Sequence, residues 1–292
     1  MPADSKDAQG SQTAAITDLQ VDLEMIEWLG SLSFECYGAR IGIRSNDASF
    51  IAHSRERLPP HMRPNEGGSV DVQYSLVAEG GFFLVYRDAK KYMQAMRLRT
   101  ALGWLELDLH KCVGINAPDH LFVHSGAVGW EGCGIVIPGR TRLGKTSLVA
   151  ELVRQGATYY SDDWTVFDRE GMLVPYAKPL MMRQPTGGRR NRQAEEIGGR
   201  VALEPMPVGL VVMTRYREGS QWRPRENSQA QAMMELLDRV LVSRKRPEFT
   251  LGILRKAVAN AAVLKGPRGE ADEVARAILD YAARSELSHC EA

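Results

Sequence analysis

The chain has 292 residues, of which 44% are hydrophobic and 25% are charged, as in an ordinary globular protein with a sizeable buried core. Its 37 Lys and Arg residues nearly balance 36 Asp and Glu residues, and this formal charge of +1 excludes a whole-molecule attraction to nucleic acid or to an anionic membrane. No apolar run reaches the roughly 20 residues of a membrane span, and the polar first residues predict no secretory signal. Four scattered cysteines without metal-ligand spacing favour a reducing, cytoplasmic compartment.

The length predicts two domains, and the pattern changes near residue 118. Residues 1–17 are polar and aperiodic, so we expect a disordered tail. The segment 18–118 is predicted to be a β-rich α+β domain, with a helix at about 100–113 and a hairpin turn at Gly80-Gly81. Its expected strands cover 32–37, 41–43, 70–77 and 82–86.

In the segment 119–286, strands alternate with helices, which predicts a layered α/β domain, followed by a short tail at 287–292. The expected strands cover 121–123, 134–137, 158–161, 164–167 and 209–213. The expected helices cover 145–155, 229–241, 251–261 and 272–283. Gly156 is placed to cap the first of these helices, and Ser228 with Gln231 resembles a capping box that opens the second.

The most informative stretch is Gly139-x-x-x-x-Gly144-Lys145-Thr146, which matches the phosphate-loop pattern between an apolar strand and an amphipathic helix. Glycines let successive backbone N–H groups converge on phosphate oxygens, while the lysine supplies charge to the β- and γ-phosphates and the threonine hydroxyl binds Mg²⁺. The residues predicted to contact ATP are Gly139, Arg140, Thr141, Arg142, Leu143, Gly144, Lys145, Thr146 and Ser147. The alternative is a Gly-rich turn with an exposed lysine. Arg140 and Arg142 either add phosphate contacts or are solvated.

Two adjacent carboxylates, Asp162 and Asp163, follow the strand 158–161. One carboxylate can hold Mg²⁺ while the other accepts the proton of an attacking hydroxyl. The alternative is a solvated pair in a turn. His124, on the strand that leads toward the loop, is either a further site residue or a hydrogen-bonded structural histidine.

In order and spacing, three blocks resemble the HPr kinase/phosphorylase-like family: the string 123–128 around His124, the loop Gly139–Thr146, and Tyr160-Ser161-Asp162-Asp163. The resemblance implies a phosphate-loop kinase domain related to phosphoenolpyruvate carboxykinase, preceded here by the β-rich domain, with ATP and Mg²⁺ as cofactors. It implies that Asp162, Asp163, His124 and Lys145 are catalytic, one aspartate acting as general base. The resemblance also implies a metal site that consists of Thr146, Asp163 and either Glu196 or Glu195.

The sequence departs from the family at Thr141-Arg142, where the family carries Ser-Gly, and it lacks the downstream signature of phosphorolysis, so neither HPr nor the reverse reaction is expected. The basic segment 187–192 either closes over phosphates or an acceptor, or is a charged loop without a ligand.

We therefore hypothesise an ATP- and Mg²⁺-dependent kinase that phosphorylates a hydroxyl, with Ser of a peptide or small protein as the leading acceptor. Two alternatives stay open: a nucleotide-binding adaptor without turnover, and a small-molecule kinase. No nucleic-acid or membrane partner is expected. Relatives in the family form oligomers, which leaves a homo-oligomer open.

Overall fold

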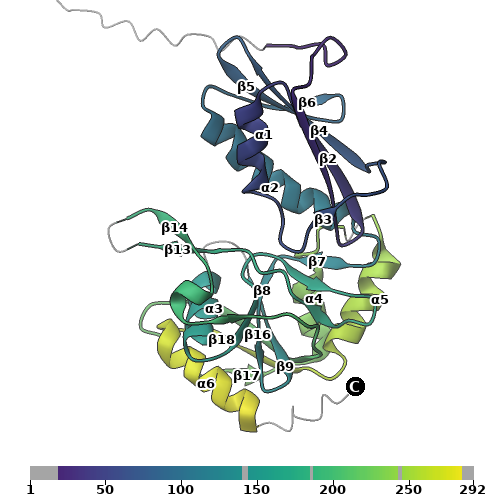
Figure 1. Cartoon of the computed structure of the whole chain (residues 1–292). Helices are drawn as coiled ribbons and strands as arrows, with labels where there is room; N and C mark the ends of the chain where they lie inside the picture. Colours follow the sequence, from purple (N-terminus) through teal and green to yellow (C-terminus); the bar gives the residue numbers. More distant parts are fainter. Residues whose placement is uncertain (1–18, 140–143, 185–186, 243–244, 285–292) are drawn as a thin grey trace, which may run out of the picture.

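The structure is a computed structural model that describes residues 19–139, 144–184, 187–242 and 245–284. It is mixed α/β, with two large sheets in separate halves of the chain (Figure 1). The predicted tails at 1–17 and 287–292 lie outside the described residues. No helix within the described ranges has the length and apolar character of a membrane span.

A six-stranded sheet forms the first half, in the order β3-β1-β2-β4-β5-β6. Its strands are β1 (Gly30–Cys36), β2 (Ala39–Ser45), β3 (Arg63–Pro64), β4 (Val72–Glu79), β5 (Phe82–Arg87) and β6 (Lys90–Ala95). The predicted turn joins β4 to β5, where Gly80 and Gly81 both have positive φ.

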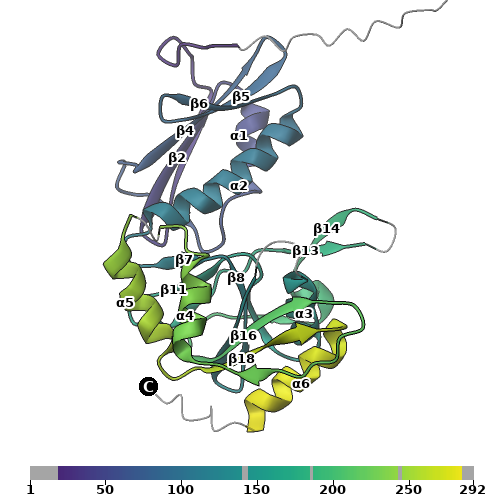
Figure 2. The ribbon, with the colours of Figure 1, turned by 180° about the vertical axis from the view of Figure 1, so that it is seen from behind.

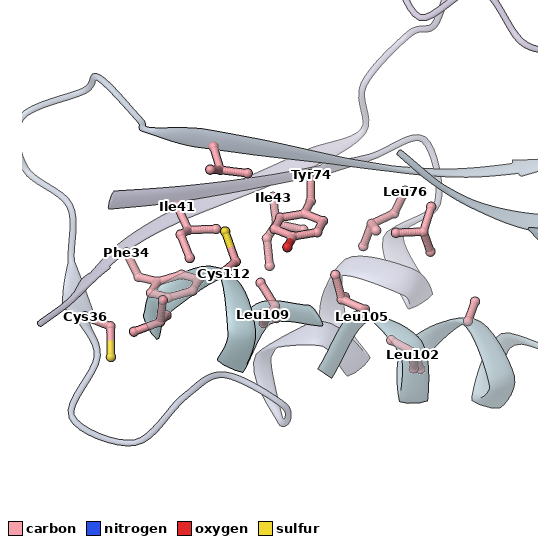
Figure 3. Close-up of a cluster of buried hydrophobic side chains, with 14 of the residues drawn as sticks. Phe34, Cys36, Ile41, Ile43, Tyr74, Leu76, Leu102, Leu105, Leu109 and Cys112 are labelled. Atoms are coloured by element: carbon pink, nitrogen blue, oxygen red, sulfur yellow. The ribbon is translucent and has the colours of Figure 1, made fainter. Parts of the chain in front are cut away.

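Helices α1 (Ala48–Arg55) and α2 (Leu98–Asn116) belong to the same half, and α2 lies along one face of the sheet. Figure 3 shows Leu102, Leu105 and Leu109 of α2 pointing at side chains from the sheet, among them Ile43 and Tyr74. The three leucines recur at helical spacing, and their burial explains why the expected helix forms. The sequence analysis missed α1, which is short and begins at the cap of Asp47.

The second half contains a seven-stranded sheet in the order β15-β10-β8-β9-β16-β18-β17, a three-stranded sheet β12-β11-β7 and the hairpin β13-β14. The first six strands of this half are β7 (Leu121–Val123), β8 (Ser125–Trp130), β9 (Cys133–Pro138), β10 (Thr158–Ser161), β11 (Thr165–Phe167) and β12 (Leu173–Val174). The later strands are β13 (Leu180–Arg183), β14 (Arg189–Arg192), β15 (Arg200–Val201), β16 (Val208–Tyr216), β17 (Arg225–Glu226) and β18 (Ala262–Arg268).

Helices cover both faces of the seven-stranded sheet: α3 (Lys145–Arg154) and α6 (Ala271–Arg284) one face, α4 (Gln229–Leu237) and α5 (Pro247–Val258) the other (Figure 2). Alternating side chains explain this layering, because Ile135 and Ile137 of β9 pack with α3 and α6 while Val136 packs with α4 and α5. The helix capped by Ser228 ends at Leu237, four residues before the expected end.

Strands β9, β16 and β18 are parallel neighbours, so their carboxyl ends meet at one edge of the sheet. The loop after β9 and the residue Arg268 at the end of β18 therefore lie together. This is the edge at which ligands bind in open parallel sheets.

The two halves are in contact. Helix α2 ends at Asn116, β7 begins at Leu121, and the core of the first half extends to Phe122, Val166 and Tyr176 of the second. The Tyr37 hydroxyl donates a hydrogen bond to the Pro175 carbonyl, which ties the β1–β2 turn to the segment between β12 and β13.

Candidate nucleotide and catalytic site

The phosphate-loop pattern lies between a strand and a helix, as the sequence predicts. Strand β9 ends at Pro138, Gly139 follows it and is buried, and α3 begins at Lys145. Gly144 caps the helix in the left-handed conformation with φ +82°, which glycine adopts without steric cost. Arg140, Thr141, Arg142 and Leu143 lie outside the described residues. The first N–H groups of α3 have no partner within the helix, and such a helix start is a site that binds anions.

Lys145 is buried at 8% exposure, and its Nζ has no hydrogen-bond partner among the described residues. Burial lowers the pKa of Lys145, while the carboxylates of Asp162 and Asp163 act against that shift. Gly126 on β8 lets α3 pack closely beside Lys145, since a Cβ there would lie only 2.6 Å from Val149 of α3. This close packing explains the glycine after His124-Ser125.

Asp162 is also buried, at 7% exposure, and its Oδ1 has no hydrogen-bond partner within the described part of the chain. The Thr146 hydroxyl lies close enough to the Asp162 carboxylate to favour its ionised form. Burial raises the pKa of Asp162 to about 6, although the positive charge of Lys145 and the Thr146 hydrogen bond oppose the rise. A hydroxyl and a carboxylate near each other at the start of α3 are oxygen ligands of the kind that Mg²⁺ takes.

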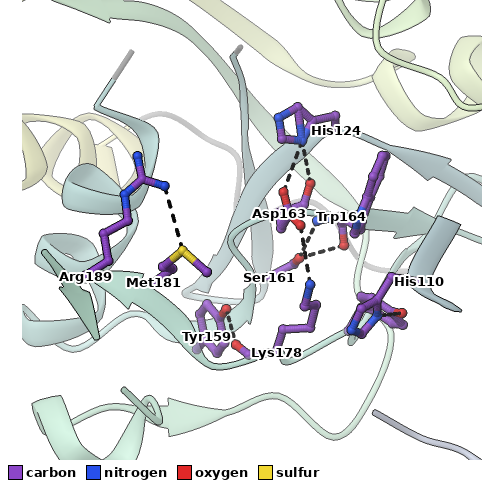
Figure 4. Close-up of polar contacts among 10 residues, drawn as sticks. His110, His124, Tyr159, Ser161, Asp163, Trp164, Lys178, Met181 and Arg189 are labelled. Atoms are coloured by element: carbon purple, nitrogen blue, oxygen red, sulfur yellow. Dashed lines mark hydrogen bonds and ion pairs between the residues drawn. The ribbon is translucent and has the colours of Figure 1, made fainter. Parts of the chain in front are cut away.

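Asp163 lies between two basic side chains (Figure 4). Its Oδ2 is 3.4 Å from Lys178 Nζ and its Oδ1 is 3.3 Å from His124 Nδ1. Its side chain is 41% exposed, unlike that of its neighbour Asp162. Of the two carboxylates, Asp163 is the one that a ligand can reach from outside.

His124 Nδ1 also lies 2.9 Å from the Asp163 backbone carbonyl. A carbonyl only accepts hydrogen bonds, so Nδ1 carries the proton and Nε2 is the acceptor nitrogen of the neutral ring. Burial and the charge of Lys145 lower the pKa of His124 to about 4, against the opposing effect of Asp163. His124 is therefore neutral at physiological pH and orients Asp163 through both its backbone and its side chain.

A tight turn after β10 brings both aspartates to one site. The Ser161 hydroxyl donates to the Trp164 carbonyl at 2.6 Å and accepts from the Trp164 N–H at 3.2 Å. The register of β10 against β8 is irregular between Tyr159 and Ser161. Consecutive strand residues would point to opposite faces, and this turn lets Asp162 face α3 while Asp163 faces His124 and Lys178.

The sequence analysis missed two basic residues of this region. Lys178 lies in an irregular segment before β13, with no local motif. Arg268 ends β18, is 2% exposed, and donates through Nη2 to the Gly144 carbonyl at 2.6 Å. Its Nε has no partner among the described residues. Arg268 precedes α6, whose first turn contains acidic residues. An arginine in that position is common, so no sequence signal identifies Arg268 as a residue of the site.

Two other predicted residues lie apart from this cluster. Ser147 is exposed in the first turn of α3. Glu196 lies in the short 3₁₀-helix Glu195–Ile197, pairs with Arg192 at 2.9 Å, and lines a groove together with Arg154. Arg154 is the last residue of α3, about 12 Å along the helix from Thr146. The structure thus does not bring Glu196 together with Thr146 and the aspartates.

Comparisons with known proteins were made at the level of sequence and of structure. No family model and no curated protein matches the sequence. Among solved structures, the HPr(Ser) kinase/phosphatase from Coxiella burnetii is similar, with 13% sequence identity and a TM-score of 0.33, over 56% of this chain and 98% of that chain. A likeness at this level does not establish a family, so the functional assignment rests on the geometry of the site.

Proposed function

We propose that the protein is an ATP- and Mg²⁺-dependent phosphotransferase that moves the γ-phosphate to a hydroxyl, with Ser of a peptide or small protein as the acceptor. One observation carries the proposal. Lys145 Nζ and Asp162 Oδ1 are both buried beside the loop at the start of α3, and neither has a hydrogen-bond partner among the described residues. Unpaired buried charges are costly, and a nucleotide phosphate with its cation would satisfy both.

The two aspartates would have different roles. Thr146 and Lys145 both favour the ionised form of Asp162, so the oxygens of Thr146 and Asp162 fit Mg²⁺ better than the pair of Thr146 with Asp163 that the family resemblance implies. The cation, when bound, neutralises charge that develops on the phosphate oxygens. Lys145 would bind the phosphates beside it.

Asp163 would act as the general base. It is exposed enough for an acceptor to approach, and Lys178 with neutral His124 hold it in place. Asp163 takes the proton of the acceptor hydroxyl, the hydroxyl oxygen forms a bond to the γ-phosphorus, and the bond from that phosphorus to the β–γ bridging oxygen breaks to release ADP.

Radiolabel transfer from γ-labelled ATP to a pool of Ser-containing peptides tests the proposal. We expect Asp163→Asn to reduce transfer by about a hundredfold or more, because general-base catalysis contributes on that order. Asp119→Asn, a surface carboxylate paired with Arg169, is the matched control and should leave transfer unchanged. Equal transfer by wild type and Asp163→Asn would refute the assignment. ATP binding without turnover on peptides or metabolites would favour the adaptor, and turnover confined to metabolites the small-molecule kinase.

A further inference from the structure

A groove rich in arginine lies at the C-terminal end of α3, at the opposite end of the helix from Lys145. Its volume is about 450 Å³, and its charged lining consists of Arg154, Arg183, Arg190 and Arg192 with the single carboxylate Glu196. Three of these arginines, Arg183, Arg190 and Arg192, belong to the hairpin β13-β14, which projects from the body of the second half above α3 in Figure 1. The sequence analysis expected a loop at 187–192, whereas β14 pairs with β13 there.

The positive charge of this groove is only partly balanced. Arg154 pairs with Glu151 and Arg192 pairs with Glu196, each at 2.9 Å. Arg183 and Arg190 have no carboxylate within ion-pair distance in the described part of the chain. Arg183 also lies directly opposite Arg189 across the hairpin, and like charges in that position are destabilising. An anionic ligand would offset this repulsion.

The floor of the groove is apolar. Met182 of β13 and Ile197 of the 3₁₀-helix are partly buried against the core formed by α3 and α6. No aromatic side chain lines the groove, which argues against stacking of nucleic-acid bases. An apolar floor between arginines and one glutamate fits a peptide that carries carboxylates beside an aliphatic side chain.

The hairpin also connects the groove to the candidate catalytic residues. Lys178, which pairs with Asp163, precedes β13 by two positions, and Tyr159 holds this segment through a 2.7 Å hydrogen bond to the Lys178 carbonyl. Arg183 is the last residue of β13. At about 3.3 Å per residue, an extended peptide needs about five residues to cover the distance from Lys178 to Arg183.

We propose that this arginine groove binds the phosphate acceptor, through a segment with acidic residues on both sides of an aliphatic residue, about five residues from the hydroxyl that is phosphorylated. The proposal rests on the proposed function for the role of the bound peptide as acceptor, while the binding itself does not require catalysis.

Fluorescence anisotropy without nucleotide tests the groove separately from the kinase activity. The probe is a labelled Glu-Glu-Leu-Glu-Gly-Gly-Gly-Ser peptide, and the same peptide with Lys in place of Glu is its control. We expect salt-dependent binding of the acidic peptide alone, and Arg183→Glu with Arg190→Glu should weaken it about tenfold or more. Arg97→Glu with Arg99→Glu makes the same charge change at exposed residues around the start of α2 and should alter binding by less than about twofold.

Retained Mg·ATP binding would show that the groove variant is folded. Equal binding of the acidic peptide to wild type and groove variant, or binding of the Lys peptide as tight as that of the Glu peptide, would overturn the proposal. An oligothymidylate of equal charge is a further competitor. If it displaces the acidic peptide at a concentration lower than the unlabelled peptide needs, the ligand is nucleic acid and the proposal is overturned. If peptide binding follows the prediction and phosphate transfer is absent, only the proposed function fails.

Discussion

Asp162 and Asp163 are adjacent in the chain and occupy opposite environments. Asp162 is buried against Thr146 and Lys145, and burial raises its pKa to about 6. Asp163 is 41% exposed between His124 and Lys178. Two neighbouring carboxylates with different surroundings are suited to different tasks, and this difference supports the assignment of cation binding to the first and proton acceptance to the second.

The buried carboxylate makes stability depend on pH. The pKa of Asp162 is about 6 in the folded protein against an ordinary value of 3.8, so its protonated form favours folding. The stabilisation that the protonated Asp162 gives the fold is fully present below pH 3.8 and is lost as the pH rises through 6. We therefore expect Asp162→Asn to increase the free energy of unfolding relative to wild type, by about 2 kcal/mol more at pH 8 than at pH 4.5.

Urea unfolding of both proteins at the two pH values measures this difference, with Asp119→Asn as a control on the surface. Asp162→Asn should also abolish phosphate transfer, so this variant would gain stability and lose activity. A stability difference that is independent of pH, or that is larger at pH 4.5, would contradict the burial of an ionised Asp162.

Among the secondary-structure elements, the connection from β9 to α3 and the end of β18 form one unit. Arg268 donates to the carbonyl of Gly144, and a Cβ on Gly144 would lie 2.5 Å from Arg268 Nη2. The arginine therefore fixes the residue at which the phosphate loop becomes a helix. Its position depends on the parallel pairing of β16 with β18, a contact between segments far apart in the sequence.

We expect Gly144→Ala to reduce the free energy of unfolding by about 2–4 kcal/mol and to weaken nucleotide binding, because it combines a left-handed alanine with a displaced Arg268. Gly132→Ala is the matched control, since Gly132 has the same φ of +82° with no atom within 4 Å of its Cβ position. Gly132→Ala should reduce the free energy of unfolding by only about 1–2 kcal/mol. Chemical unfolding measures the first effect and nucleotide titration the second. An equal loss in free energy of unfolding for the two variants would show that Arg268 does not constrain Gly144.

Local patterns explain which elements and site residues could be predicted. Helical spacing of apolar residues indicated α2 and α3, and the capping pattern at Ser228 indicated the start of α4, where Ser228 accepts from the Gln231 N–H. The strand that ends at Pro138 and the helix that begins at Lys145 followed from a motif that physics constrains tightly. The turn at Ser161 was not predicted, and it decides that the two aspartates face different partners.

Other features depend on contacts that no local pattern encodes. Lys178 reaches Asp163 only because Tyr159 and Tyr176 hold its segment against β10 and α2. The hairpin β13-β14 places Arg183 opposite Arg189, which a propensity argument disfavours. The family resemblance implies a metal-binding role for Glu196 or Glu195, yet Glu196 lies at the far end of α3 with Arg154.

For the whole molecule, the near-zero charge conceals separate clusters. Lys145 and Lys178 lie near Asp162 and Asp163, and Arg268 contacts Gly144 at the start of α3, while the arginine groove lies at the other end of α3. The first half contributes to the site indirectly. His110 of α2 lies 2.5 Å from the hydroxyl of Tyr176, two residues before Lys178. The β-rich half thus helps to hold the segment that carries a site residue.

Calorimetric titration of Mg·ATP into the full chain tests the central claim most directly. The claim is that Lys145 Nζ and Asp162 Oδ1, which have no hydrogen-bond partner among the described residues, are satisfied by a nucleotide and its cation. We predict binding to wild type, loss of about a hundredfold or more in affinity for Lys145→Met, and nearly unchanged affinity for Asp163→Asn. Binding by Lys145→Met as tight as by wild type, or no binding by wild type, would contradict the account.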